Sequence, residues 1–162
     1  MEQKNLDKIY RPCYTQPESH YHVSQAKSRQ VYVVDDDYDE RYFISRQLRQ
    51  SETVKSIFTF DGAETLFQYF DETGFYQKPR QDIQNSVILL DIHMPAINGL
   101  EILDYMRSHP KTSELDIVLL TSDESHQNIY EAYKLEATAY LQKPLCLNSF
   151  DQLMLGQNGW KS

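Results

Sequence analysis

Acidic, hydroxyl and amine side chains follow four of the apolar segments in this sequence. The set consists of Asp35, Asp36 and Asp37 after residues 30–34, Asp91 after 86–90, Thr121 after 116–120, and Lys143 after 138–142. Two carboxylates about 4 Å apart repel by about 1 kcal/mol in water and by about 4 kcal/mol at an effective dielectric constant of 20. The aspartate run therefore indicates either a bound cation or a solvated turn that caps the next helix.

Brought together, these side chains could perform phosphoryl chemistry. Carboxylate oxygens are ligands that Mg²⁺ accepts in proteins, and a cation would relieve the repulsion among them. Positive charge also stabilises the equatorial oxygens of a transferring phosphoryl group, to which Lys143 and the Thr121 hydroxyl would contribute. Carboxylates can attack phosphoryl groups as nucleophiles, and Asp91, on the central strand, is best placed to do so. Each residue alone has an ordinary structural explanation. The hypothesis of phosphoryl chemistry therefore depends on their placement together.

The elements that must position these residues alternate between strand and helix. Strands are predicted at 30–34, 54–60, 86–90, 116–120 and 138–142, and helices at 38–50, 61–70, 99–108, 124–136 and 148–155, with a long polar loop over 71–85. Such alternation predicts an α/β fold with a doubly wound, five-stranded parallel sheet. Ligand sites in these sheets form outside the carboxyl ends of the strands, where the candidate residues stand.

Length and composition narrow the class of protein. The chain has 162 residues, a typical size for one domain, and a net charge of −8, which argues against direct binding of nucleic acid. We expect no signal peptide and no membrane span, because the apolar runs are too short. The two cysteines, Cys13 and Cys146, form neither a CxxC pair nor a disulfide framework, so a reducing cytoplasm is the expected location.

The chain divides by composition into three parts. Residues 1–29 are polar, contain two prolines and carry a net charge of +2, whereas the remainder carries −10. We expect 1–29 to be a flexible arm, 30–156 to be the folded domain and 157–162 to be a short tail.

Four segments together resemble one known family. The sequences "VVDDD", "LLDIHMPAINGLEIL", "IVLLTSD" and "AYLQKPL" are similar to the strand ends of response-regulator receiver domains in bacterial two-component signalling, and "DGAE" fits the start of their second helix. The resemblance covers residues 30–155. It implies a flavodoxin-like receiver fold with strand order 2-1-3-4-5.

The resemblance implies a role for each acidic residue. Asp91 corresponds to the phospho-acceptor, and Asp35 and Asp36 to the acidic pair that binds Mg²⁺, with Asp36 as the direct ligand. The backbone carbonyl of His93 corresponds to the third protein ligand of the metal. Asp37 is then a third acid at the helix start, either a cap or an additional charge.

The remaining roles concern switching and lifetime. Thr121 resembles the switch hydroxyl, Lys143 the lysine that pairs with the phosphoryl group, and Tyr140 the aromatic switch residue; Lys143–Pro144 corresponds to the family's cis peptide bond. His93 and Asp123 each lie two residues after Asp91 or Thr121. We predict that they flank the water path and tune hydrolysis, although two solvated side chains would explain them equally well.

The implied function is a stand-alone receiver that accepts a phosphoryl group from a histidine kinase or phosphotransfer protein. No effector domain is expected after residue 156, so the signal would leave through a phosphorylation-dependent surface, and a phosphorylation-dependent homodimer stays open. Three alternatives remain: a haloacid-dehalogenase-like phosphohydrolase, a flavin-binding protein and a non-phosphorylated interaction module. The sequence departs from the family pattern in the long 71–85 loop, in Glu136 where a glycine is common, and in a short last helix.

Overall fold

A parallel β-sheet forms the centre of the computed structural model, which describes residues 10–11, 28–123 and 125–156. Its strands are β1 (Tyr10–Arg11), β2 (Arg29–Val34), β3 (Val54–Phe60), β4 (Ser86–Asp91), β5 (Asp116–Thr121) and β6 (Ala139–Gln142). They lie in the order β1-β6-β5-β4-β2-β3, and every pairing is parallel. Without β1, this is the predicted five-stranded order 2-1-3-4-5, which is confirmed.

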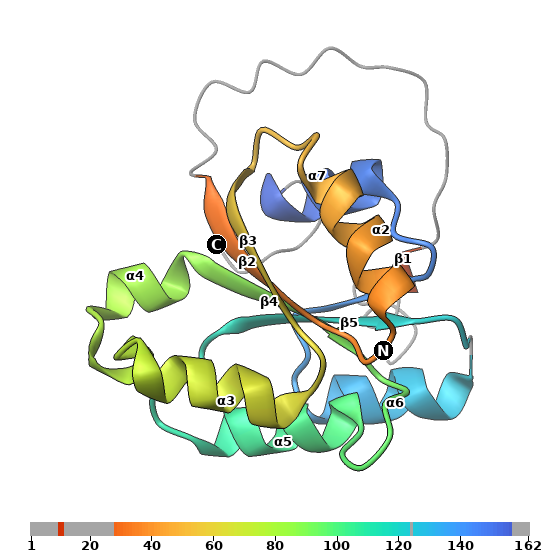
Figure 1. Cartoon of the computed structure of the whole chain (residues 1–162). Helices are drawn as coiled ribbons and strands as arrows, with labels where there is room; N and C mark the ends of the chain where they lie inside the picture. The colour runs from red at the N-terminus through yellow and green to blue at the C-terminus, as the bar shows by residue number, and fades with distance from the viewer. Residues whose placement is uncertain (1–9, 12–27, 124, 157–162) are drawn as a thin grey trace.

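Helices cover both faces of the sheet (Figure 1). They are α2 (Tyr38–Leu48), α3 (Ala63–Glu72), α4 (Arg80–Gln84), α5 (Gly99–Ser108), α6 (His126–Lys134) and α7 (Leu147–Met154), with a 3₁₀ helix η1 (Phe75–Gln77). Helices α3, α5 and α6 pack on one face, and α2 and α7 pack on the other. Among the described residues, no helix is both long and apolar enough to cross a lipid bilayer.

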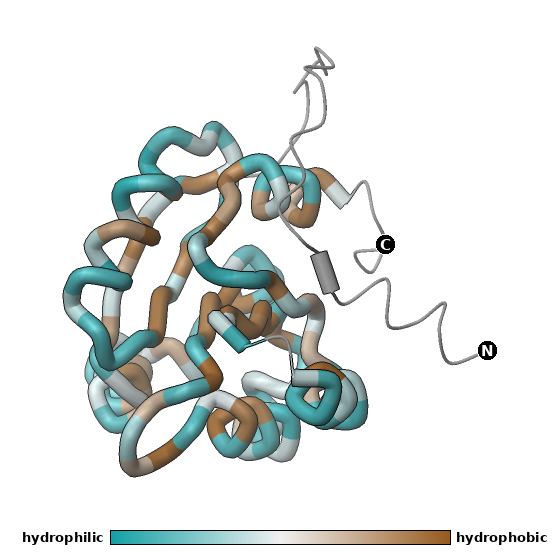
Figure 2. Tube along the Cα trace, turned by 90° about the vertical axis from the view of Figure 1, so that its right-hand side faces the viewer, coloured by the Kyte–Doolittle hydropathy of each residue, from teal (hydrophilic) through white to brown (hydrophobic). Residues whose placement is uncertain are grey.

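Each face of the sheet has its own hydrophobic core. The strands alternate their side chains between the two cores, so that Val34 and Leu90 face α3 and α5, whereas Val33 and Leu89 face α2 and α7. In Figure 2, the apolar parts of the trace lie in the interior and the polar parts outside. All six residues of β4 are buried, as expected for a central parallel strand covered on both faces.

The stretch from 71 to 85 differs from the predicted loop. It contains η1 and α4, and it contributes the buried residues Phe75 and Ile83 to the core. Phe75 stacks on Phe70 of α3 with ring centroids 3.9 Å apart. The prediction missed this because two apolar residues in a polar stretch show no period, and their burial depends on the neighbouring helix.

The first strand of the predicted sheet begins one residue earlier than the predicted range 30–34. Strand β2 starts at Arg29, which is buried and forms an ion pair of 2.5 Å with Asp116 of β5. The predicted arm 1–29 also contributes the two-residue strand β1, which pairs with β6. The rest of the arm and the tail 157–162 lie outside the described residues.

Cys146 does not behave as predicted. Cys146, which immediately precedes α7, is disulfide-bonded. The expectation that the chain forms no disulfide is therefore wrong, and the argument from cysteine usage to a reducing cytoplasm is lost with it. Cys13, the other cysteine of the sequence, lies outside the described residues.

Glu136 occupies the position where the family commonly has glycine, and its backbone explains that preference. Its φ is 57°, in the left-handed region, which costs a residue with a Cβ about 1–2 kcal/mol. We expect Glu136→Gly to raise the free energy of unfolding by about 0.5–1 kcal/mol, because the relieved strain exceeds the added entropy of the unfolded chain.

Urea denaturation would measure this change, and Glu136→Ala is the matched control. The alanine variant loses the same carboxylate but keeps the Cβ. The contact from the Arg107 side chain to the backbone carbonyl of residue 136 is available to both variants. Equal stability of the glycine and alanine variants would contradict the strain argument.

Candidate functional site

The carboxyl ends of β2, β4 and β6 bring three charged residues into contact. Lys143 follows β6, and its Nζ lies 2.6 Å from Asp35 Oδ2 and 3.2 Å from Asp91 Oδ1. Asp35 and Asp91 are 1% and 4% exposed, so both carboxylates are removed from bulk water. Since buried charges need partners, the ammonium group is what makes two buried carboxylates tolerable here.

Burial and charge act in opposite directions on these groups. Desolvation raises the pKa of Asp91; the Lys143 ammonium lowers it and the nearby Asp35 raises it, so that the net shift is upward. Burial lowers the pKa of Lys143, but hydrogen bonding to Asp35 and the charge of Asp91 outweigh burial and raise it overall. The lysine is therefore held in its charged form beside the Asp91 carboxylate.

An acidic cluster that could hold a cation surrounds this lysine contact. Asp35, Asp36 and Asp91 each offer a carboxylate oxygen, and these oxygens lie within 4.8 Å of one another. Asp36 is exposed, unlike the other two, so its carboxylate faces the solvent from which a metal would enter. Oxygen ligands from one or two carboxylates with water completing the shell suit Mg²⁺, and these residues fit that ion.

We expect Asp36→Ala to abolish the stabilisation that Mg²⁺ confers. Adding Mg²⁺ should raise the melting temperature of the wild-type chain and leave that of the variant unchanged, because a ligand stabilises only the state that binds it. Without metal, the variant should melt higher than wild type, since one of three mutually repelling carboxylates has been removed.

Differential scanning fluorimetry across a Mg²⁺ titration measures both effects. Asp39→Ala is the matched control, because Asp39 is an exposed acid in the first turn of α2 and is not part of the cluster. Equal Mg²⁺ shifts in wild type and Asp36→Ala would mean that the acidic residues serve only the local structure.

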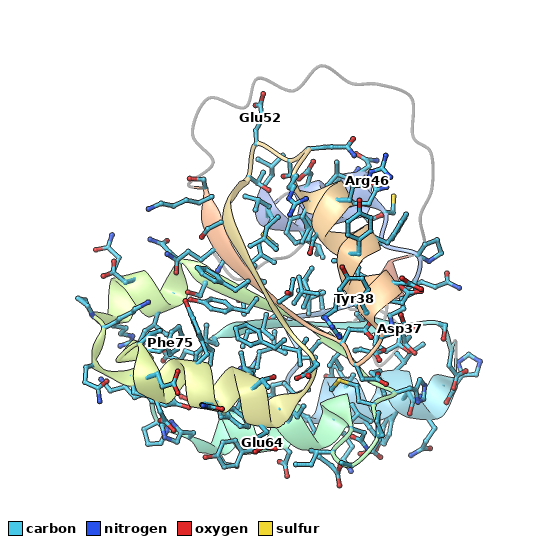
Figure 3. All side chains as sticks on the ribbon, viewed as in Figure 1. Asp37, Tyr38, Arg46, Glu52, Glu64 and Phe75 are labelled. Carbon is cyan, nitrogen blue, oxygen red and sulfur yellow. The ribbon has the colours of Figure 1, made fainter. Side chains whose placement is uncertain are left out.

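The loop that carries the acidic pair is fixed by its own hydrogen bonds. Asp37 is the N-cap of α2, and its Oδ1 accepts from the backbone amides of Asp39 and Glu40 at 2.8 and 3.1 Å. Of the two interpretations of Asp37, a helix cap or an additional charge, the structure therefore supports the cap. Figure 3 shows Asp37 at the start of α2. Sequence reasoning missed Arg41, whose Nη1 donates to the backbone carbonyls of Asp35 and Asp36 at 2.7 and 3.1 Å.

Thr121 and Tyr140 are fully buried. The Thr121 Oγ1 accepts from the backbone amide of Asp123 at 3.1 Å, and the Tyr140 hydroxyl donates to the backbone carbonyl of Asp123 at 2.8 Å. The loop after β5 thus connects the two residues that the sequence marks as switch elements. The cis peptide bond expected between Lys143 and Pro144 is present.

His93 and Asp123 approach each other at the solvent-facing side of the site. His93 Nε2 lies 3.8 Å from Asp123 Oδ2, and both side chains are about half exposed, at 53% and 51%. The structure therefore brings together the two residues predicted to flank the water path. Whether they tune hydrolysis stays a prediction, as does the role of the His93 carbonyl as a metal ligand.

Gly99 was not identified as a site residue, yet it determines how closely the start of α5 approaches the backbone of Asp91. A Cβ placed on Gly99 would lie 2.2 Å from the backbone oxygen of Asp91 and 2.9 Å from the Ile92 Cα. The Gly99 amide donates to the Ile92 carbonyl at 2.8 Å. The available signal was the pattern "PAING", in which a glycine directly follows the capping residue Asn98.

The family model of the response regulator receiver domain matches residues 31–154 of this sequence. The chain belongs to this family. The match covers both cores, the acidic cluster and Lys143. The predicted membership is confirmed, and with it the general assignment to two-component phosphorelay signalling.

The curated relatives include a sensory transduction protein and several response regulators. The chain is 37% identical over 70 residues to the sensory transduction protein LytT of Oceanobacillus iheyensis, covering 43% of this chain but only 28% of that protein. It is 21% identical over 127 residues to the response regulator Rcp1 of a Synechocystis strain, covering 78% of this receiver and 84% of Rcp1. It is also 27% identical to the Arabidopsis thaliana two-component response regulator ARR6 over 76% of this chain and 66% of that one.

Solved receiver structures show the same fold. The chemotaxis protein CheY4 of Vibrio cholerae is similar to this receiver with a TM-score of 0.63 and 21% identity, over 81% of this chain and 98% of that one. A receiver domain from Rhodospirillum rubrum gives a TM-score of 0.64 and 24% identity, over 78% of this chain and 91% of that one. At these identities the likeness concerns the fold alone.

Proposed function

We propose that this receiver accepts a phosphoryl group on Asp91 from a histidine kinase or a phosphotransfer protein and transmits a signal through a change of surface. The observation that carries the proposal is the double contact of Lys143 Nζ with Asp35 and Asp91 inside a three-carboxylate cluster. This arrangement provides a nucleophile, a cation site and a fixed positive charge at one point, which together are what phosphoryl transfer requires.

In the proposed reaction, a carboxylate oxygen of Asp91 attacks the phosphorus of a phosphohistidine or of acetyl phosphate. The new O–P bond forms as the bond from phosphorus to the donor breaks, and the donor leaves. Asp35, Asp36 and Asp91 would hold a Mg²⁺ ion, which would supply charge neutralisation. Lys143 then moves its hydrogen bond from the carboxylate of Asp91 to a phosphoryl oxygen, and the Thr121 hydroxyl offers a second donor.

We propose that the chain phosphorylated on Asp91 acts on protein partners in the cytoplasm. ATP-dependent kinases would supply the phosphoryl group there. The chain acts in this proposal as a phospho-acceptor and not as an enzyme with turnover of a small substrate.

Intact-protein mass spectrometry tests the proposed function directly. Incubation of the full chain with acetyl phosphate and Mg²⁺ should add the mass of one phosphoryl group, and chelation of the metal should prevent the addition. No mass change under these conditions would contradict the proposal and favour a non-phosphorylated interaction module. Continuous release of phosphate from a small phosphomonoester would contradict it and favour a phosphohydrolase.

Side-chain removal at His93 and Asp123 should shorten the life of the phosphorylated form. The two side chains are about half exposed and lie two residues after Asp91 and Thr121, and we propose that their loss opens a path for water to the phosphoryl group. We expect the double variant His93→Ala, Asp123→Ala to lose the phosphoryl group roughly threefold faster or more, because solvent exclusion slows hydrolysis. The rate of phosphoryl uptake should not change.

The decay of the phosphorylated mass after removal of the donor measures this lifetime. Asp123→Asn with His93→Ala is the matched comparison, because the Asp123 Oδ1 also accepts from the backbone amide of Ser125 and asparagine can keep that contact. A half-life identical to that of wild type in the double alanine variant would show that the two residues are ordinary solvated side chains.

A further inference from the structure

Strand β3 forms one edge of the sheet, and it is long and almost uncharged. Among the described residues it pairs with β2 alone, and it runs for seven residues from Val54 to Phe60. Lys55 is its single charged residue, and it contains neither proline nor glycine. Figure 1 shows β3 in front of the other strands, with α2 and α3 on either side of it. A long hydrophobic edge of this kind is a template for pairing with a further strand.

The backbone of β3 presents hydrogen-bonding groups along this edge. The amide of Asp35 donates to the Phe60 carbonyl at 3.1 Å, so the backbone of Phe60 faces β2. Because the backbone groups of a strand alternate in direction, those of Lys55, Ile57 and Thr59 face away from β2. Within the described part of the chain, no strand or loop receives or supplies hydrogen bonds at these outward groups.

The edge is held in place by the cores beneath it. The Phe58 ring stacks on Tyr32 with centroids 5.2 Å apart and contacts Tyr69 at 5.4 Å. On the opposite face of the sheet, Ile57 packs partly buried against the core under α2 and α7. A strand that is already fixed loses little conformational freedom when a second strand joins it, which favours association.

We propose that β3 pairs antiparallel with β3 of a second copy of this chain, with the two-fold axis at Ile57, so that the two sheets become one. In this register the outward groups of Ile57 meet those of Ile57 in the second copy, and those of Lys55 meet those of Thr59. Each outward residue of one strand therefore exchanges both backbone hydrogen bonds with a residue of the other.

The side chains favour this register and this partner. On one face, Lys55 lies opposite Thr59 of the second copy, and Asp61 of that copy is its diagonal neighbour, within reach of a long side chain. Lys55 and Asp61 are both exposed, so opposite charges approach at both ends of the contact. On the other face, the large Phe58 lies opposite the small Ser56. Because the strand complements itself in charge and in size, we assign the edge to a second copy.

The dimer goes beyond the proposed function, because it does not require phosphorylation. The two copies of β3 run in opposite directions, so the sheet edges that carry the two acidic clusters point away from each other. Neither Asp91 nor Lys143 takes part in the contact. Each copy therefore keeps its acidic cluster outside the dimer interface.

Sedimentation equilibrium of the full chain without a phosphoryl donor tests the pairing. Wild type should change from monomer to dimer as the concentration rises from roughly 1 μM to 1 mM, the range of weak association. Thr59→Pro should raise the Kd of the dimer about tenfold or more, because each copy loses an outward backbone donor. Proline is tolerated on an edge strand where its nitrogen faces solvent, and the Thr59 side chain is exposed. Thr59→Ala keeps the amide and is the matched control.

Lys55→Glu is a second variant, and it leaves every backbone group in place. Its carboxylate would approach Asp61 of the second copy, so the Kd should rise about fivefold or more at low ionic strength. Added salt should reduce this difference, because exposed charges are screened. Lys55 is exposed, and the fold of the variant can be checked by circular dichroism.

Amide hydrogen exchange of the wild-type chain needs no variant. Peptides that contain residues 55–59 should exchange more slowly at concentrations where the dimer forms than in the dilute monomer. Peptides from the central strand β4, which is buried throughout, should not change and serve as the internal control.

Three results would overturn the proposal. The first is a monomer at every concentration, which would leave the edge to a strand of another protein. The second is a dimer that Thr59→Pro and Lys55→Glu both leave unchanged while their circular dichroism matches wild type. The third is slow exchange of residues 55–59 in the dilute monomer, because another segment of the chain would then cover the edge. None of these readouts depends on whether Asp91 is phosphorylated.

Discussion

Replacing Asp91 with asparagine is expected to abolish phosphoryl uptake from acetyl phosphate. The amide has nearly the shape of the carboxylate but lacks the anionic oxygen that attacks phosphorus. Asp91 ends the central strand β4 and contacts Lys143 at 3.2 Å. Intact-protein mass should show no phosphoryl adduct in this variant.

The same variant should be more stable than wild type at neutral pH. The pKa of Asp91 is raised in the folded state, mainly by burial, so the folded chain binds a proton more readily than the unfolded chain does. Above the folded pKa, the ionised carboxylate therefore lowers the free energy of unfolding, and asparagine removes this effect. Lys143 keeps its contact with Asp35 in the variant.

Asp37→Asn is the matched control for both measurements. It makes the same chemical change at a neighbouring rim position, and asparagine is as good an N-cap as aspartate. The control should take up one phosphoryl group like wild type. Uptake by Asp91→Asn at the wild-type level would show that another residue is the acceptor.

Substitution of Gly99 by alanine is expected to have the largest effect on stability. The added methyl group would overlap the backbone oxygen of Asp91 at 2.2 Å, and backbone cannot move aside as a flexible side chain could. Overpacking of this kind typically costs about 1–3 kcal/mol, and we expect a loss near the upper end of that range. Because the displaced backbone belongs to Asp91 itself, phosphoryl uptake should also fall.

Chemical denaturation and adduct formation would be measured on the same preparation. Gly62→Ala is the matched control, because nothing lies within 4 Å of a Cβ at that position and its φ of 173° is open to any residue. We expect the control to change stability by less than about 1 kcal/mol, the size of a cap effect. A small effect of Gly99→Ala, comparable to that of the control, would mean that α5 can shift away from the acceptor strand at little cost.

The order of elements could be predicted because it depends on local sequence patterns. Continuous apolar residues in β4 and helical spacing in α5 each reflect burial, which the sequence records residue by residue. The same patterns predicted where the strands end. Those predicted ends placed Asp91, Thr121 and Lys143 at one edge of the sheet. The capping role of Asp37 was also within reach, since it depends only on the residues that follow it.

Contacts between distant segments were decided only by the tertiary structure. Lys143 and Asp35 are 108 residues apart in sequence, and their distance of 2.6 Å depends on how β2, β4, β5 and β6 align across the sheet. The burial of Phe75, the pairing of β1 with β6 and the disulfide at Cys146 likewise left no periodic signal. The requirement for glycine at position 99 has the same origin, because it arises from the packing of the start of α5 against the backbone of Asp91. Hydrophobic periodicity reports which face of an element is buried, whereas the partner on that face is determined by register and chain path.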